Sequence, residues 1–432
     1  NEALGYDSAA TVPALDPAKG MDVITYTGTG STRDVGGLQF EPGLVWTKST
    51  SLNELHILSD SVRGVPKNLY AHLTNAEDTA GYVTALNYDG FKVAGSAGSV
   101  NQNGASYVAW NWQAGGPAVA NTAGTITSQV SANTDYGFSI ATYSTTGSAG
   151  TIAHGLTNQT PKFIITKQRN GTTGWYCYHA SLGATKNIRL DTTAAAGTSS
   201  AIWNDTAPTT SLFSVGNGFS NGEDYVAYIW SEIDGYSKFG SYSGTGNAVK
   251  VTTGFKPRWI LVRSTSASRE WLIWDSERGA NNGAIRTNSN GTPYSDSTYN
   301  GVTFDSDGFT IMTGASTPNM SGSGETYIYA AFADRPGNDW DVNNIVTNEG
   351  LATNKDNFDV VTYTGNGGNQ KLGGPVYSDS LVASNGSFDS VAPAASAFNG
   401  ETGTADGDYA QASSGSNPNS LTFTPAGGIA YS

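Results

Sequence analysis

The chain has 432 residues, a length that favours about three domains. Only 13% of the residues are charged, against a typical ~25%, whereas glycine fills 54 positions. The 22 Tyr, 15 Phe and 10 Trp residues argue against a disordered chain, so the composition is typical of a turn-rich β protein. The formal net charge of −14 argues against a nucleic-acid partner, because no surplus of Lys and Arg is present to neutralise phosphates.

The single cysteine, Cys177, permits no intrachain disulfide, so stability has to come from packing. No stretch approaches the roughly 18 consecutive apolar residues of a membrane span, and we expect no membrane partner. The chain begins at Asn1 rather than Met, and residues 427–432 stop within an expected strand. We interpret the sequence as a piece of a longer protein.

The predicted elements begin after residues 1–20, which contain two prolines and are expected to be a linker or the tail of a preceding domain. The first module is predicted at 21–116. Its last strand, 107–112, alternates Val and two Trp with Tyr, Ala and Asn, so that both faces carry apolar groups. Such a strand is expected in the middle of a two-sheet sandwich.

The rest of the chain is divided by changes in composition. Residues 117–136 are rich in Thr, Ser and Ala, and are predicted to be a linker with one strand at most. The second module is expected at 137–232 and the third at 235–337, with almost no joint between them. A further linker is predicted at 338–357. Residues 358–432 are expected to hold a partial fourth copy of the opening phrase and the start of another β domain.

A repeated phrase defines these modules. Each of the first three copies opens with Tyr and a glycine-rich turn and closes on an aromatic strand that begins with Tyr. The two tyrosines of a copy are 81, 82 and 85 positions apart, whereas the spacing between copies varies more. The pairs are Tyr26 and Tyr107, Tyr143 and Tyr225, and Tyr242 and Tyr327, and a fourth opening starts at Tyr363. A constant interior with variable connections indicates a folded module repeated in tandem.

A second phrase in each module places Pro before an apolar strand that ends in a cation. The cations are Lys48, Lys167 and Arg263. Proline at a strand entrance removes no ladder hydrogen bond. We expect a structural role for the phrase and solvated side chains for the three cations.

A third phrase is Asp-Ser-x-Arg-Gly, at 60–64 in module 1 and 275–279 in module 3. An Asp and an Arg three residues apart can hold a loop by a bidentate ion pair, or can form a ligand loop. Module 2 has Ala180-Ser181-Leu182-Gly183 instead. We favour the loop staple, which module 2 has to replace by other means.

Two sets of aspartates are candidates for calcium ligands. Asp89-Gly90-Phe91 and Asp307-Gly308-Phe309 are typical hairpin signals. The segment 339–350 begins like a calcium loop but lacks the Gly at its sixth position and the Glu at its twelfth. We therefore predict no metal site and no cofactor.

Signals for catalysis are weak throughout. The sequence has no Gly-x-Ser-x-Gly elbow, His-Glu-x-x-His or phosphate loop, and the four histidines lack ligand spacing. We predict no catalytic residues and leave any binding residues open. The tryptophans are expected in the cores rather than on a sugar-binding surface. Trp203, within a polar loop, is the one expected to be exposed.

Taken together, these phrases resemble a module that recurs in structural proteins of tailed bacteriophages, chiefly marine and cyanobacterial ones. The resemblance covers about 21–116 and 235–337, whereas module 2 fits at its ends but lacks the third phrase. It implies a virion appendage built from lectin-like β-sandwiches, with no catalytic residues.

The expected fold is therefore all-β, with tandem β-sandwich modules, jelly-roll or lectin-like, joined by short linkers. The expected function is that of a non-enzymatic virion structural protein, in a tail fibre or a capsid or tail appendage exposed on the particle. The expected partners are other virion proteins, further copies of the chain (a trimer being one option) and, as an option, a host surface glycan. A bacterial cell-surface adhesin or carbohydrate-binding array is the first alternative, and a polysaccharide depolymerase is the second.

Overall fold

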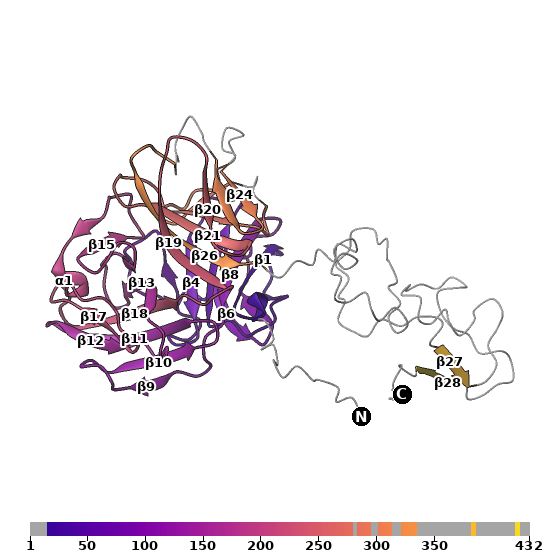
Figure 1. The fold of residues 1–432 in the computed structure, drawn as a ribbon. Helices are drawn as coiled ribbons and strands as arrows, with labels where there is room; N and C mark the ends of the chain where they lie inside the picture. Colours follow the sequence, from indigo (N-terminus) through magenta and orange to yellow (C-terminus); the bar gives the residue numbers. More distant parts are fainter. Residues whose placement is uncertain are drawn as a thin grey trace, which may run out of the picture. The chain divides into compact units, whose positions relative to one another are not determined.

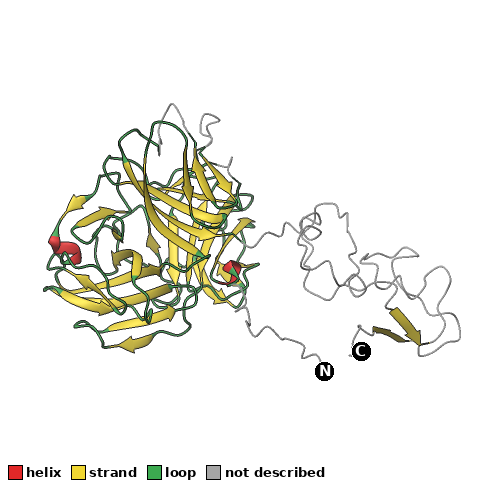
Figure 2. Ribbon diagram, in the orientation of Figure 1, coloured by secondary structure: helices red, strands yellow, loops and turns green. Residues whose placement is uncertain are grey.

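The computed structural model describes residues 15–279, 283–294, 301–312, 321–334, 382–385 and 420–423. Nearly all regular structure in these residues is antiparallel β-sheet, which confirms the all-β class (Figure 2). The chain divides into two compact units, Asn1–Gly337 and Asn338–Ser432. In the second unit the structure describes one antiparallel pair, β27 (Val382–Asn385) with β28 (Ser420–Phe423). The partial fourth copy and the segment 338–357 lie outside the described residues.

Module 1 is a β-sandwich that follows a short 3-10 helix, η1 (Pro17–Lys19). Its larger sheet has the order β1-β8-β3-β4-β5 and its smaller sheet the order β2-β7-β6. The strands are β1 (Met21–Thr27), β2 (Arg33–Gly36), β3 (Leu44–Ser49), β4 (His56–Asp60), β5 (Leu69–Tyr70), β6 (Val83–Asn87), β7 (Gly90–Val93) and β8 (Ser106–Trp112).

Module 3 repeats this topology strand for strand. Its sheets have the orders β19-β26-β21-β22-β23 and β20-β25-β24. The identical order confirms that modules 1 and 3 are copies of one fold. The strands are β19 (Ser237–Ser243), β20 (Val249–Thr252), β21 (Pro257–Ser264), β22 (Leu272–Asp275), β23 (Ile285–Arg286), β24 (Val302–Asp305), β25 (Gly308–Ile311) and β26 (Thr326–Ala333).

Module 2 keeps the central strands and extends them. Its sheet has the order β16-β15-β14-β13-β18-β11-β10-β9, beside the pair β12-β17 and the helix α1 (Ser200–Trp203). The strands are β9 (Val119–Asn121), β10 (Ser128–Asn133), β11 (Phe138–Thr146), β12 (Gly150–Ala153), β13 (Pro161–Gln168), β14 (Tyr176–His179), β15 (Lys186–Arg189), β16 (Gly197–Thr198), β17 (Leu212–Val215) and β18 (Asn221–Ser231).

The prediction of a linker at 117–136 was wrong. This stretch contains two strands, β9 and β10, and β10 pairs with β11 along its whole length. Val130, which is buried, is the only large apolar residue of β10, and the others are Ser, Gln, Ala and Asn. A pattern with so few apolar residues looks like a linker in the sequence, yet β10 covers an edge of the sheet that would otherwise be exposed.

The paired tyrosines explain the constant length of each copy. Tyr26 and Tyr107 lie directly opposite each other on β1 and β8, with stacked rings 5.1 Å apart. The corresponding pairs in modules 2 and 3 are also cross-strand partners, at 5.8 Å and 5.0 Å. An insertion or deletion between the two tyrosines would shift this pairing unless a loop accommodated it. The spacing within a copy therefore varies little.

In modules 1 and 3, glycine follows two residues after the opening Tyr, because another chain segment passes too close there for a side chain. The Gly28 amide donates to the Ala105 carbonyl at 2.8 Å, and a Cβ on Gly28 would lie 2.2 Å from the Gln102 carbonyl oxygen. Gly244 has the same contact in module 3, with a Cβ position 2.1 Å from the Gly322 carbonyl oxygen. The glycine-rich turn therefore anchors the loop that precedes the closing tyrosine.

The side chains on the two faces of each large sheet pack in different cores, one inside the module and one between the modules. On β8, Tyr107 and Ala109 pack inside module 1, whereas Val108, Trp110 and Trp112 enter a core shared by all three modules. Modules 2 and 3 divide their residues in the same way between an internal core and the shared one. The short connections thus join modules that lie side by side in one body and surround one common core (Figure 1).

An aromatic cluster lies within this shared core. Trp112, Trp230 and Phe332 occupy equivalent positions at the ends of the three closing strands. The Trp112 ring lies 5.7 Å from the rings of both Trp230 and Phe332, and 5.4 Å from that of Trp259. Edge-to-face contacts of this kind add to the stabilisation from buried area. The three modules therefore form one folded unit.

Candidate functional site: the polar seams between modules

Polar side chains cross the three boundaries between modules, which we call the 1–2, 2–3 and 1–3 seams. The first set of hydrogen bonds across the seams comes from one aromatic residue in each module. This residue lies at, or directly before, the start of β4, β14 or β22. Each ring N–H donates to backbone carbonyls of a neighbouring module, at distances between 2.8 and 3.2 Å. The donors are His56 (to Arg286 and Ser289), Trp175 (to Tyr70 and Leu73) and Trp271 (to Arg189).

These contacts form a closed ring. Module 1 donates to module 3, module 3 to module 2, and module 2 to module 1. The sequence analysis missed this role because neither His56 nor the two tryptophans belong to a recurrent phrase. An alignment of the copies on the third phrase would have placed His56 opposite Trp175 and Trp271, four residues before Asp60, His179 and Asp275.

A second crossing lies at the end of the same strands. Asp60 accepts a hydrogen bond from the Tyr228 hydroxyl of module 2 at 2.8 Å. Asp275 accepts one from the Trp110 indole of module 1 at 3.0 Å. At the matching position module 2 carries a histidine, His179, whose Nε2 donates to the Tyr329 carbonyl of module 3 at 3.0 Å.

The loop staple predicted for the third phrase is confirmed. Arg63 pairs with Asp60, and the Asp60 carboxylate also accepts from the Arg63 amide at 2.7 Å. The Arg278 Nε donates to Asp275 at 2.8 Å in the same manner. In module 2, the Ser181 amide donates to Nδ1 of His179 at 3.2 Å, so that a neutral imidazole replaces the ion pair.

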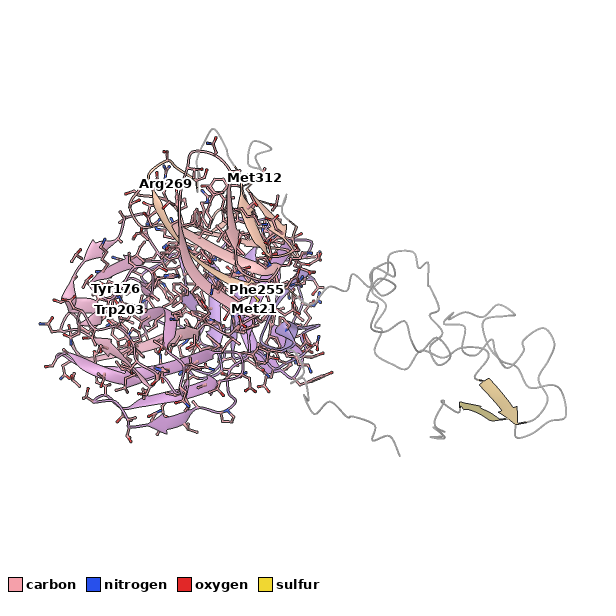
Figure 3. The ribbon with its side chains drawn as sticks, in the orientation of Figure 1. Met21, Tyr176, Trp203, Phe255, Arg269 and Met312 are labelled. Atoms are coloured by element: carbon pink, nitrogen blue, oxygen red, sulfur yellow. The ribbon has the colours of Figure 1, made fainter. Side chains whose placement is uncertain are left out.

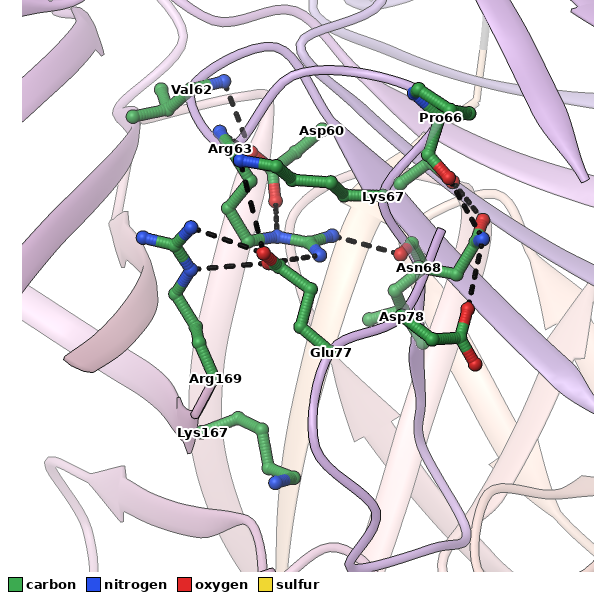
Figure 4. A network of polar contacts seen from close by, with 12 residues as sticks. Asp60, Val62, Arg63, Pro66, Lys67, Asn68, Glu77, Asp78, Lys167 and Arg169 are labelled. Carbon is green, nitrogen blue, oxygen red and sulfur yellow. Dashed lines mark hydrogen bonds and ion pairs between the residues drawn. The ribbon is translucent and has the colours of Figure 1, made fainter. Parts of the chain in front are cut away.

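The 1–2 seam adds a charged network to this staple (Figure 4). Arg63 donates to Glu77 at 3.1 Å, and Arg169 of module 2 donates to both oxygens of Glu77 at 3.1 Å. Burial alone would lower the pKa of Arg63, but Asp60, Tyr228 and Glu77 raise it above its usual range. A single carboxylate therefore joins an arginine from each of two modules.

The expectation that the three strand-end cations are solvated was wrong. Lys48, Lys167 and Arg263 are fully buried. Lys48 donates to the Ser49 and Leu52 carbonyls, whereas Lys167 and Arg263 each reach a carbonyl of a neighbouring module, on Thr74 and Ala194. Burial lowers the pKa of each lysine to about 8 and that of Arg263 to about 10. Their long stems let them satisfy buried carbonyls that no backbone amide reaches.

The expectation for the aromatic residues was confirmed for the core tryptophans and wrong for Trp203. Trp46, Trp110 and Trp175 are at most 1% exposed. Trp203, labelled in Figure 3, is also only 1% exposed. The helix α1 turns its ring toward that of Tyr178, 5.9 Å away. One turn of helix, capped by Ser199, is too short to be visible in the sequence pattern.

The Asp-Gly-Phe phrases form the predicted hairpins, β6–β7 and β24–β25. The Asp307 carboxylate pairs with Lys250 at 2.8 Å, and Asp305 accepts from the hydroxyls of Thr303 and Thr310. Within the described residues, no three His, Cys, Asp or Glu side chains are grouped so that they could hold a metal ion. The segment 339–350 lies outside those residues.

The structure thus defines a class of protein: an all-β unit in which three related modules share one aromatic core and are joined by polar seams. The chain belongs to the family described as domain of unknown function DUF7483, whose model matches residues 16–336. That range coincides with the three modules, so the family is defined by the whole unit rather than by one module. No curated protein and no solved structure matches the chain. None of the described helices is long and apolar enough to cross a membrane.

Proposed function

We propose that this protein is a non-enzymatic structural component of a tailed-phage particle, in a tail fibre or in a capsid or tail appendage exposed on the virion. The observation that carries the proposal is the single core shared by three sandwiches of one chain. Such a unit resists bending between modules, since any relative movement would expose Trp112 and its aromatic neighbours to water. Rigidity without disulfides suits a part that has to keep its shape outside a cell.

The use of charged residues supports a structural role. Asp60, Glu77, Asp22 and Glu325 each pair with an arginine, and these pairs hold loops or join modules. A carboxylate that has to accept or donate a proton in a reaction needs an environment that shifts its pKa towards the working pH. Here each of the four carboxylates is instead engaged by an arginine in a contact that has a structural role.

We further propose that the partners are other virion proteins, with a host surface glycan as a second partner. A homotrimer is one arrangement of the assembled appendage, although the three modules already provide a threefold set of contacts within one chain. Several weak contacts on one particle would combine through effective concentration, so that no single module has to bind tightly.

Cryo-electron microscopy of the source particle tests this proposal. Density for the three-module unit along a tail or capsid appendage would support it and would show which loops face outward. Localisation of the chain on a cell surface, with none on particles, would overturn it in favour of the adhesin. Hydrolysis of host envelope glycans by the purified chain would favour the depolymerase.

A further inference from the structure

All four histidines of the chain have a pKa that burial lowers below the ordinary value. They are His56, His72, His154 and His179. Burial lowers the pKa of His72, His154 and His179 to about 4, and that of His56 well below its usual range. Two of them cross seams, and both seams belong to module 3.

The hydrogen-bond partners of His56 permit one protonation state. The indole N–H of Trp46 donates to Nδ1 at 3.1 Å, so Nδ1 has to carry a lone pair. Nε2 therefore carries the proton and donates to the Arg286 and Ser289 carbonyls of module 3. A second proton, on Nδ1, would point at the Trp46 N–H and would lose that hydrogen bond.

The same restriction holds at His179. Its Nδ1 accepts from the Ser181 amide at 3.2 Å, and its Nε2 donates to the Tyr329 carbonyl of module 3. The partners are again an N–H on one side and a carbonyl across the seam on the other. Only the neutral imidazole satisfies both.

The charged and titratable groups that face His56 also oppose a positive charge on its ring. His56 lies opposite Lys48 in the strand register and 5.7 Å from the ring of His72, and both lower its pKa after burial. Arg286 of β23 and Glu54 act on the pKa of Lys48 in opposite directions. His179 faces the ring of Phe163 at 5.8 Å and the strand that carries Tyr329, whose pKa is raised to about 12 by burial and by Glu232.

We propose that acidification loosens module 3 from modules 1 and 2, because the imidazoles of His56 and His179 are buried at its two seams and each accepts an N–H at Nδ1, which a protonated ring cannot do. The 1–2 seam is held by Trp175 and by the Arg63–Glu77–Arg169 network, which uses no histidine. Module 3 is therefore the part that responds to acid, while modules 1 and 2 stay joined. This inference depends on these contacts and not on the phage proposal.

Two backbone amides provide matched reporters for the test. The Ala196 amide of module 2 donates to the Thr265 carbonyl of module 3 at 3.0 Å, across the 2–3 seam. The Glu77 amide of module 1 donates to the Arg169 carbonyl of module 2 at 2.7 Å, across the 1–2 seam. Hydrogen exchange of the 432-residue chain between pH 6.5 and pH 4 reports on both seams in one sample.

We expect the protection factor of the Ala196 amide to fall by up to about tenfold per pH unit for each histidine that takes up a proton. The protection factor of the Glu77 amide should stay nearly constant over the same range. Loss of protection at both amides together would mean global unfolding and would overturn the proposal. Unchanged protection at Ala196 would overturn it as well.

Variants separate the seam histidines from the others. In a His56→Gln/His179→Gln double variant, the amide keeps a donor and an acceptor but does not titrate, so the acid response of the Ala196 amide should disappear. His154→Gln is the matched control, since His154 accepts from the Leu156 amide and donates to the Thr209 carbonyl entirely within module 2. The control should keep the acid response of the 2–3 seam. A double variant that responds to acid like the wild type would contradict the proposal.

The wild-type protein gives an independent check if the double variant does not fold. The ring protons of the four histidines can be followed by NMR during acidification. We expect the His179 resonances to shift only as the Ala196 amide loses protection. Protonation of His179 near its ordinary pKa of ~6.5, with the 2–3 seam still protected, would show that the seam tolerates the charge and would rule the proposal out.

Discussion

The 1–2 and 2–3 seams solve one problem with opposite chemistry. At the end of the second central strand, module 1 has Asp60 and module 2 has His179, and each makes a hydrogen bond to the neighbouring module. Asp60 forms an ion pair with Arg63, whereas the imidazole of His179 has only backbone partners. The two seams therefore share the same strand-end position in the backbone and differ in the side chain at that position. We expect that side chain to decide how each seam responds to pH.

We expect the largest loss of stability from a substitution in the aromatic core, which contacts all three modules. Replacing Trp112 by Ala would remove contacts with Trp230, Trp259 and Phe332 and leave a cavity in the shared core. We expect a loss of about 3–5 kcal/mol in the free energy of unfolding. Urea denaturation monitored by far-UV circular dichroism should remain a single transition. Separate transitions for the three modules would show that the shared core does not couple the seams.

The charged staple of the 1–2 seam should be the next most sensitive feature. Asp60→Asn keeps an acceptor for Tyr228 but leaves Arg63 buried without its nearest negative charge, and we expect a loss of about 3 kcal/mol. Asp307→Asn is the matched control, because it removes one carboxylate from the exposed pair with Lys250. Thermal unfolding of the two variants should show a large decrease in Tm for the first and almost none for the second. Equal decreases would mean that burial of the pair is irrelevant.

The buried lysines predict the behaviour of the protein in alkali. Because the folded-state pKa of Lys48 and Lys167 is about 8, below the ordinary ~10.4, the unfolded chain binds more protons above pH 8. The free energy of unfolding should therefore rise between pH 8 and pH 9, by about 1 kcal/mol for each lysine. Cys177, whose pKa is raised by burial, opposes this rise as pH approaches 9, because only the unfolded thiol ionises there.

Urea midpoints at pH 8 and pH 9 measure this effect. Lys167→Met should reduce the rise by about half, since Lys48 remains. Above pH 10 the buried tyrosines should reverse the trend, because burial raises the pKa of Tyr143 and Tyr225 above that of a free phenol. A free energy of unfolding that falls steadily from pH 8 would show that the two lysines are not held in a buried environment.

The sequence predicted the modules well and their assembly poorly. Alternating apolar residues in 107–112 showed that both faces of the strand are buried, and the paired tyrosines fixed the extent of each copy. The same alternation is equally consistent with a sandwich of two sheets and with three sheets around a common core. Contacts such as those of Trp112 with Trp230 and Phe332 distinguish these arrangements, and they join positions more than a hundred residues apart.

The polar residues of the seams were harder to predict for a related reason. A Lys or Arg at the end of a strand is usually solvated, and its burial depends on carbonyls supplied by another module. Thr74 and Ala194 provide such carbonyls to Lys167 and Arg263, yet nothing in their side chains indicates it. Every residue type has a backbone carbonyl, so a residue that accepts such a hydrogen bond cannot be recognised from the sequence.

The smallest expected effect is the coupling energy of the ion pairs that cross the 1–2 and 2–3 seams, and it compares the two seams directly. Glu77 and Arg169 join modules 1 and 2 through two hydrogen bonds, and both side chains are mostly buried. Glu232 and Lys238 join modules 2 and 3 at 2.7 Å, but the lysine side chain is 41% exposed. Double-mutant cycles with Gln at each position isolate the coupling energy of each pair.

We expect a coupling energy of about 1 kcal/mol for Glu77 with Arg169, because the geometry is bidentate and water is largely excluded. The Glu232–Lys238 pair should give no more than about 0.5 kcal/mol, and 0.5 M salt should reduce it further, since exposed pairs are screened. Equal coupling in the two cycles would mean that the 1–2 seam gains nothing from its charged network. The contrast between the two seams would then rest on Asp60 and His179 alone.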